Sequence, residues 1–526
     1  HLRATANLST GGTAIDRTDD IHPDNAAIAR RAALTIGLDI AGIDFIAPDI
    51  ARSVRETGGG IVEVNAAPGF RMHLEPFEGR PRDVAEAVIR MMFPHGAPSR
   101  IPIIAVTGTN GKSTTTRMVA HILRRSGLTV GLTSTNGVYV NDERIAAWDA
   151  SGPASARMVL RDPTVDAAVL ETARGGILRE GLAFARCDVG AVLNVQEDHL
   201  GVKGVDTIED LARIKSVVVE AVHRDGCSVL NADDPLAAGM ADRAGGRVAF
   251  FSLRGGDDMP AFLRRHLEEG GLAVVREPTP DGGELVVHHD ERRLPLMRAA
   301  AIPATLGGLA EFNVQNALAA IAISFAHGLP PSVIRSALAT YESSYEQCPG
   351  RLNVFDGHGF RVILDYAHNP AGMAAIGHLV RGLRPRHGRC IGMVGCPGDR
   401  RDEDIRAVGA TAAGAFDELV FRERPEQRGR PDGQVMSLLT EGALAAGLPR
   451  ERVRLVADEF EALEACLRAA RPGDLVVLTP ASTEEAWRRI LAFRPAPRPA
   501  PARLPDPAPS PLPPPALLPA PEMAHV

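Results

Sequence analysis

The chain has 526 residues, which is enough for roughly two to four domains that each bury their own core. Its hydrophobic content of 45% and charged content of 23% are ordinary for a globular protein, and a formal net charge of −7 gives no support for a nucleic-acid or anionic-membrane partner. No apolar stretch approaches the roughly 20 residues of a membrane helix, and the six cysteines lack metal-ligand spacing. These features favour a cytoplasmic protein in a reducing compartment.

Four regions follow one another along the chain. The first covers residues 1–95, and because the sequence starts at His1 in what looks like a strand, we expect a truncated N-terminus. Apolar strands alternate with helical patterns over 100–340 and 345–493, which predicts α/β domains with parallel, doubly wound sheets. The last region, 494–526, holds 13 of the 40 prolines and is predicted to be a disordered tail.

Three polar residues of the first region are spaced for magnesium chemistry. Glu63 and Asn65 alternate on one face of an expected strand, and Asp44 ends a preceding apolar run. Two carboxylates and an amide oxygen make a sound Mg²⁺ cage beside phosphates. The alternative is that the three are polar groups at strand ends without a ligand.

Residues 101–116, IPIIAVTGTNGKSTTT, combine an apolar run, a glycine-rich loop and the start of an amphipathic helix. The free N–H groups at such a helix start can bind phosphates, while Lys112 supplies a point charge and Ser113 a magnesium ligand. The order of these elements makes a chance strand–helix turn the weaker interpretation. The predicted nucleotide-binding residues are Gly108, Thr109, Asn110, Gly111, Lys112, Ser113 and Thr114.

Two further strands of the second region end in metal-binding side chains. Glu171 follows one apolar run, and Asp198 and His199 follow another. Because ligands gather at the carboxyl ends of parallel strands, we expect Glu171 and His199 to converge on the phosphate loop. Ser113 and Glu171 offer the oxygen ligands that Mg²⁺ prefers. His199 is a softer ligand, so a base or a core histidine remains open as its role.

Together these motifs resemble the Mur ligase superfamily, which includes the folylpolyglutamate synthetases. The resemblance is carried by GTNGKS at 108–113, by Glu171, by DHLG at 198–201 and by DYAHNP at 365–370. It implies that Glu171 and His199 bind divalent metals. It also implies that Lys215 holds a second metal after carbamylation, with a solvated helix lysine as the open alternative.

The same resemblance assigns the rest of the nucleotide site. EFNVQNALAAIA at 311–322 implies that Asn316 faces the adenine. PGRL and DYAHNP imply that Arg351 and Asp365 reach the phosphates and the ribose from the third region. His368 either hydrogen-bonds in the closed site or has a structural role in an Asn-Pro turn.

Two other segments carry weaker expectations. The loop GCPGDRRDED at 395–404 resembles a third-domain loop of the superfamily, in which Arg400 or Arg401 would grip the incoming amino acid. The segment 251–305, with its Gly-Asp and Pro-Asp-Gly turns, is predicted to be a β-rich lid or insertion with no assigned function.

One sequence segment indicates a particular family within the superfamily. ETARGGILREGL at 171–182 resembles the cyanophycin synthetases. NLSTGGTAID at 7–16, GLDIAGIDF at 37–45 and EVNAAPGFRMH at 63–73 resemble the C-terminal half of an ATP-grasp domain of that family. There Asp44, Glu63 and Asn65 would hold magnesium. The N-terminal half of that domain is absent from this sequence, so we expect its site to bind ATP poorly.

The resemblance implies an ATP- and Mg²⁺-dependent amide ligase with Lys112, His199, Arg351 and His368 as catalytic residues. ATP would convert a carboxylate into an acyl phosphate, and arginine would be added to the aspartate side chain of a poly-aspartate backbone. The expected partners are a cyanophycin primer, arginine and aspartate, in a homo-oligomer (tetramer or dimer). The alternatives are a folylpolyglutamate synthetase, a polymerase of aspartyl-arginine dipeptides and an inactive scaffold.

Overall fold

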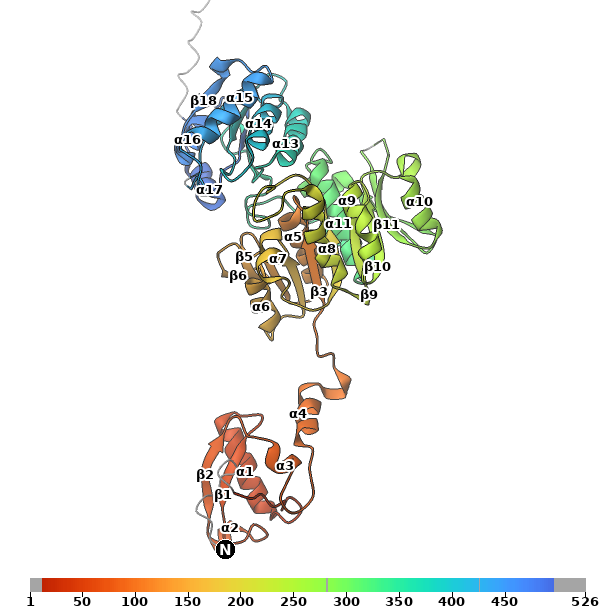
Figure 1. Cartoon of the computed structure of the whole chain (residues 1–526), viewed down its shortest axis with the longest axis vertical. Helices are drawn as coiled ribbons and strands as arrows, with labels where there is room; N and C mark the ends of the chain where they lie inside the picture. The colour runs from red at the N-terminus through yellow and green to blue at the C-terminus, as the bar shows by residue number, and fades with distance from the viewer. Residues whose placement is uncertain (1–11, 281, 425, 496–526) are drawn as a thin grey trace, which may run out of the picture. The chain divides into compact units, whose positions relative to one another are not determined.

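The computed structural model describes residues 12–280, 282–424 and 426–495. Contacts between residues divide the chain into two units, His1–Ile101 and Pro102–Val526 (Figure 1). The predicted disordered tail beyond Pro495 and the first five residues of the 7–16 motif lie outside the described residues.

The first unit is built around a two-stranded antiparallel sheet. β1 (Gly42–Ile46) pairs with β2 (Gly60–Asn65), so that Asp44 lies opposite Glu63. Asp44 is therefore in the middle of its strand, not at its end as predicted. The helices of this unit are α1 (Pro23–Ile36), α2 (Val54–Thr57), α3 (Arg71–Leu74) and α4 (Val84–Met92).

No apolar side chain is buried among the described residues of this unit. Its two buried residues, Asn25 and Ser53, are polar, whereas Leu34 is 70% exposed and Phe77 is 74% exposed. Domains of this size normally need a buried apolar core to be stable. The apolar faces of this unit are thus uncovered within the unit itself.

The second unit begins with an 11-stranded sheet in the order β13-β12-β11-β10-β9-β8-β3-β7-β4-β5-β6. Its middle strands are parallel, and β3 is buried along its whole length between β7 and β8. The strands are β3 (Ile103–Thr107), β4 (Val130–Ser134), β5 (Gly137–Val140), β6 (Glu143–Ala146), β7 (Ala167–Glu171), β8 (Cys187–Val192), β9 (Val222–Asn231), β10 (Arg247–Ser252), β11 (Leu272–Glu277), β12 (Glu284–His289) and β13 (Arg292–Arg298).

Helices cover both faces of this sheet. α5 and α11 contact each other and one apolar cluster, and α8 packs into the cluster on the other face. The helices are α5 (Lys112–Arg125), α6 (Pro153–Arg161), α7 (Arg174–Glu180), α8 (Ile208–Glu220), α9 (Pro235–Ala238), α10 (Ala261–Glu268), α11 (Glu311–Ala326) and α12 (Pro331–Leu338). This arrangement places the start of α5 at the carboxyl ends of the parallel strands, where ligands usually bind.

Two expectations about the sheet need correction. The sheet is mixed rather than wholly parallel, because the pairs β4–β5 and β5–β6 at one edge and β11–β12 and β12–β13 at the other are antiparallel. The segment 251–305 is β-rich as predicted, but its strands β11, β12 and β13 extend this same sheet and do not form a separate lid. Short antiparallel hairpins need no crossover helix, so they add to a sheet edge without the alternating pattern of a parallel unit.

A second sheet of six strands follows, in the order β14-β15-β19-β16-β17-β18. All its pairs are parallel except β14 with β15. The strands are β14 (Asn353–Phe355), β15 (Arg361–Leu364), β16 (Cys390–Val394), β17 (Glu418–Phe421), β18 (Val453–Leu455) and β19 (Leu475–Leu478). The helices are α13 (Pro370–Leu383), α14 (Asp402–Ala413), α15 (Gln434–Ala445), α16 (Glu459–Ala469) and α17 (Thr483–Ala492). The predicted α/β fold class is confirmed by these two helix-covered sheets.

Among the described residues, none of the helices combines the length and the apolarity that crossing a bilayer requires.

Candidate active site

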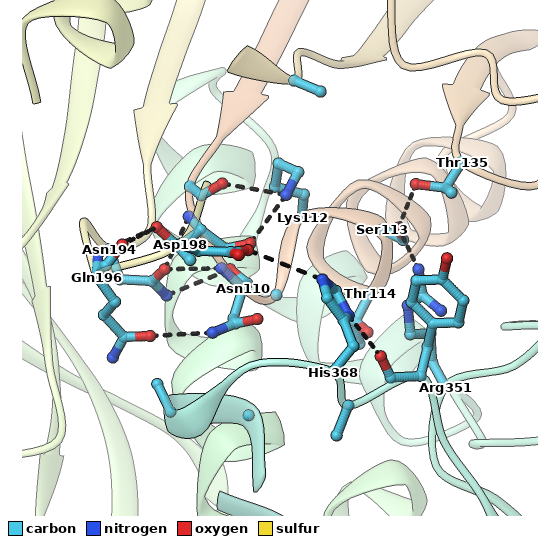
Figure 2. A pocket seen from close by; sticks show the side chains of 18 of the residues that line it. Asn110, Lys112, Ser113, Thr114, Thr135, Asn194, Gln196, Asp198, Arg351 and His368 are labelled. Atoms are coloured by element: carbon cyan, nitrogen blue, oxygen red, sulfur yellow. Dashed lines mark hydrogen bonds and ion pairs between the residues drawn. The ribbon is translucent and has the colours of Figure 1, made fainter. Parts of the chain in front are cut away.

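A cavity of about 430 Å³ lies where loops of the two sheets of the second unit meet (Figure 2). The 11-stranded sheet contributes the loop after β3 and the start of α5, and the six-stranded sheet contributes the segments after β15 and β16. The predicted site residues that line it are Gly108, Thr109, Asn110, Gly111, Lys112, Ser113, Thr114, Glu171, His199, Lys215, Asn316, Arg351, Asp365 and His368.

The glycine-rich loop is held by side chains beneath and beside it. The Asn194 Oδ1 accepts hydrogen bonds from the N–H groups of Thr109 and Asn110 at 3.0 and 2.8 Å. Gly111 has φ of +85°, and a Cβ there would lie 2.3 Å from the Asn316 Oδ1, so only glycine fits. Helix α5 starts at the next residue with no side-chain cap, which leaves its first N–H groups facing the cavity.

Lys112 folds back over this loop. Its Nζ donates hydrogen bonds to the carbonyl oxygens of Gly108 and Thr109 at 3.1 and 3.0 Å. Both acceptors are neutral, so they leave the ammonium charge uncompensated, and Lys112 lines the same cavity as the start of α5. A phosphate group is the ligand that such a pair of positive features favours.

Oxygen atoms gather around Glu171 on the other side of the loop. The Ser113 hydroxyl donates to one carboxylate oxygen at 2.8 Å, and the Thr135 hydroxyl donates to the other at 3.0 Å. The Thr135 N–H also donates to Glu171, at 3.0 Å. Hard oxygen donors of this kind suit Mg²⁺. In the part of the chain that the structure describes, no group of three or more His, Cys, Asp or Glu is placed to hold a metal.

Asp198 joins the two sheets through a buried ion pair with Arg400, whose Nε lies 2.7 Å from the Asp198 Oδ1. Burial disfavours the Asp198 carboxylate, but His368, when it is protonated at low pH, and the charge of Arg400 hold the pKa of Asp198 well below the usual range. Burial lowers the pKa of His199 and of His368 to about 4, so both rings are neutral at neutral pH. Arg400 also contacts the His199 Nε2 at 2.9 Å.

Arg351 reaches the phosphate loop from the second sheet. Its guanidinium donates to the Ser113 hydroxyl at 3.4 Å and lies over the Tyr366 ring, 4.6 Å from the ring centre. Asp365 lines the cavity, and its carboxylate accepts from the N–H groups of Leu352 and Ala367 at 2.9 and 2.8 Å. Burial raises the pKa of Asp365.

A reciprocal pair of amides forms a second bridge between the sheets. The Asn110 Nδ2 donates to Asn369 at 3.3 Å, and the Asn369 Nδ2 donates back at 3.2 Å. Asn369 also donates to Asp198 at 3.2 Å. The phosphate loop is thus tied directly to the start of α13.

Lys215 points into the same cavity from α8. It is 2% exposed, and burial together with the neighbouring Lys112 charge lowers its pKa to about 7. The solvated helix lysine considered above is therefore wrong. A buried amine with a pKa of about 7 is half neutral at pH 7, and the neutral form can act as a nucleophile toward carbon dioxide.

Models of two protein families match this second unit. A Mur ligase middle domain covers residues 106–324, and a Mur ligase glutamate ligase domain covers 350–482. The UDP-N-acetylmuramoyl-L-alanyl-D-glutamate–2,6-diaminopimelate ligase of Geobacter metallireducens is 30% identical over 72% of this chain and 73% of its own length. The chain belongs to the Mur ligase family.

Other Mur ligase relatives match almost the whole chain. Cyanophycin synthetases of Synechocystis sp. and Geminocystis herdmanii are 50% and 51% identical over 94% and 92% of it. The chain spans about half the length of these relatives, 55% and 54%. Among solved structures, E. coli FolC in complex with DHPP and ADP has a TM-score of 0.56 at 19% identity, covering 80% of this chain and 96% of that one. That likeness shows the shared fold.

Of three further predicted residues, Asn316 and Arg400 line the cavity and Arg401 does not, and all three have hydrogen-bond partners within the protein. The Asn316 amide bonds Thr115 and Asn313 under the loop. Arg400 is fully engaged by Asp198, Asp399 and His199, and Arg401 by Glu197 and Asp404. These contacts hold the loop in place, and the expected contact of either arginine with an incoming amino acid stays a prediction.

Several residues of the cavity escaped sequence reasoning. The lining also includes Thr135, Arg174, Asn194, Gln196, Tyr366, Arg424 and Arg428. Asn194 and Gln196 follow β8 directly, so the rule that strand ends carry ligands could have identified them. Arg424 and Arg428 lie in a loop after β17, and no local sequence pattern identifies them as site residues.

The three predicted magnesium ligands of the first unit share one face of its β1–β2 sheet. Asp44 lies opposite Glu63, and Asn65 is two residues further along the same strand. Asp44 and Glu63 are exposed, and Asn65 is half-buried.

Proposed function

We propose that the second unit is an ATP-dependent amide ligase of cyanophycin synthesis, which adds arginine to the aspartate side chains of a poly-aspartate backbone. The observation that carries this is the convergence of Lys112, Ser113 and Glu171 with Arg351 from the other sheet in one cavity. Identity near 50% to cyanophycin synthetases supports the substrate class. Aspartate addition belongs to the proposed ATP-grasp part, of which the first unit would be a portion.

The cavity fits the triphosphate of ATP. The uncapped start of α5 and the Lys112 ammonium offer positive charge at one point. The N–H groups of Thr109 and Asn110 are already taken by Asn194, so the phosphates would be bound by the first turn of α5. Arg351 supplies a planar guanidinium on the opposite side, suited to spread phosphoryl charge.

The cavity also fits magnesium. Ser113 and Glu171 would hold the ion through oxygen, with a carbamylated Lys215 and His199 as further ligands. When bound, the ion would neutralise charge on the phosphates.

The chemistry follows from positioning. A carboxylate oxygen of the acceptor would attack the γ-phosphorus as its bond to ADP breaks, giving an acyl phosphate. The arginine amine would then attack the acyl carbon, the amide would form, and phosphate would leave. Lys112 and Arg351 would stabilise the charge that develops on the phosphoryl oxygens. The His368 Nδ1 donates to the Tyr366 carbonyl oxygen, which leaves its neutral Nε2 able to accept the proton of the amine.

The experiment uses the full chain with ATP, Mg²⁺, arginine and an aspartate-ended primer. We expect phosphate release that depends on both arginine and primer, with a primer mass increase of one arginine residue. Lysine in place of arginine and a folate with glutamate serve as control substrates. Absence of arginine-dependent phosphate release, or equal turnover of the folate pair, would contradict the proposal.

Without magnesium and before any carbamylation, the free amine of Lys215 gives the protein a measurable pH dependence. Its pKa is about 7 when folded and near the ordinary 10.5 when unfolded. Between these values only the unfolded state holds the proton, so stability rises with pH across this window. We expect Lys215→Met to remove a slope of up to about 1.4 kcal/mol per pH unit from the free energy of unfolding measured in urea. The exposed Lys203→Met is the control. Equal slopes for both variants would contradict a buried, neutral Lys215.

A further inference from the structure

A single asparagine organises the linker between the two sheets, residues 339–352. Asn353 is the first residue of β14 and is completely buried. Its Oδ1 accepts from the Gly350 N–H at 2.7 Å, and its Nδ2 donates to the carbonyl oxygens of Ser343 and Cys348, each at 3.0 Å. A weaker bond reaches the Arg351 carbonyl at 3.4 Å. One side chain thus closes the last ten residues of the linker into a loop.

The turn inside this loop is strained. Gly350 has φ of +70° and Leu352 has φ of +51°, a left-handed conformation that costs an ordinary residue about 1–2 kcal/mol. A Cβ on Gly350 would lie 2.7 Å from the Thr483 side chain, so the turn is pressed against the start of α17. The Asp365 carboxylate holds the Leu352 N–H from the other side. Such strain persists only where the surroundings enforce it.

Arg351 sits at the centre of this strained turn. Its backbone is flanked by the two left-handed residues, and its guanidinium projects to Ser113 at the phosphate loop. The side chain also lies over Tyr366. The turn thus carries the Arg351 guanidinium toward Ser113, and Asn353 bonds the backbone of the turn at Gly350 and Arg351.

We propose that Asn353 is the positioning residue for Arg351: its buried amide holds the linker turn that aims the guanidinium at the phosphate loop. This deepens the proposed function, on which it rests. Aspartate is the sharpest replacement, because it keeps the shape but has no N–H to give to the linker carbonyls. The buried carboxylate would face those carbonyls, and the turn would relax away from Ser113.

The kinetic test compares Asn353→Asp with a matched variant. We expect kcat for arginine-dependent phosphate release to fall about 100-fold, since displacement of a catalytic group by about 1 Å has that effect. The affinity for ATP should fall no further than in Arg351→Ala, because α5 and its loop are untouched. Asn25→Asp is the control: Asn25 is also buried and also bonds the backbone, at Ile50, Arg52 and Val54, but in the first unit.

A double-mutant cycle shows whether Asn353 acts through Arg351. In an Arg351→Ala background, Asn353→Asp should lower kcat by less than about threefold further, because coupled residues are not additive. A full 100-fold loss in that background would overturn the proposal and leave Asn353 as a general structural residue. Unchanged kcat in the single variant would overturn it as well.

A fluorescence measurement tests the linker without reference to substrates. Trp487 stacks on Tyr345 of the linker, with ring centres 5.2 Å apart and planes within 6°. The chain has two tryptophans, so Trp148→Phe leaves Trp487 as the single reporter. In that background we expect Asn353→Asp, and not Asn25→Asp, to increase acrylamide quenching. If the protein adds no arginine, the proposed function fails, and unchanged quenching is then the result that separately overturns the role of Asn353.

Discussion

Lys112→Ala is expected to lower arginine-dependent phosphate release by about 100- to 1,000-fold, the loss that follows removal of one preorganised charge-stabilising group. Lys112 donates only to neutral carbonyl oxygens of its own loop. Its charge is therefore not used in an ion pair within the protein and is available to a bound ligand. The loop is also held by Asn194, so it should keep its shape without the lysine. Steady-state phosphate release with saturating ATP, arginine and primer measures the effect.

The chain offers a matched control for this experiment. It has three lysines, and Lys203 is exposed in the loop after β8. Lys203→Ala removes the same charge from the protein but should leave kcat within about twofold, as expected of an exposed side chain outside the cavity. Lys112→Arg should restore little activity, because the planar guanidinium of arginine is larger than the compact ammonium group that it replaces. Near-normal kcat in Lys112→Ala would contradict the phosphate-binding role of the loop.

Features that depend on residues close in sequence were predictable. Local patterns of apolar residues, glycine and helix starts predicted the loop after β3 and the strand that ends at Glu171. They also predicted the alternation of strands and helices in the third region. The family followed from motif order and is confirmed by the matching relatives. Roles of individual side chains in catalysis stay predictions.

Features that depend on distant contacts were not predictable. Asn110 and Asn369 are 259 residues apart, and nothing local in either motif indicates that their amides pair. The ion pair of Arg400 with Asp198 was not predictable because Asp198 belongs to the other sheet. β14 has three residues, too few for a periodic pattern, and the antiparallel edges of the large sheet lack the alternation that marks parallel units.

The largest effect on stability is expected at a buried ion pair of the six-stranded sheet. Arg422 and Glu459 are almost fully buried, and their side chains meet at 2.9 Å. Burial lowers the pKa of Arg422 to about 10, with Glu459 opposing the shift, so the guanidinium stays charged. Arg422 also donates to the Thr479 carbonyl oxygen, and Glu459 accepts from the Ala481 and Ser482 N–H groups. The pair thus ties together the ends of β17 and β19 and the start of α16.

Removing one partner leaves the other charge buried without compensation. We expect Arg422→Met to lower the free energy of unfolding by about 3–5 kcal/mol, whereas the double variant Arg422→Met/Glu459→Gln should recover part of that loss. Trp487 on α17 reports urea unfolding of this sheet when Trp148 is replaced by Phe. The matched control is Arg361→Met, which breaks an exposed pair with Asp356 and should cost less than about 1 kcal/mol.

Since Gly395 packs against the Arg422 guanidinium at the end of β16, Arg422→Met should also disturb the loop that carries Arg400. A loss in Arg422→Met no larger than in Arg361→Met would mean that water reaches Glu459 and that burial does not set the strength of this pair.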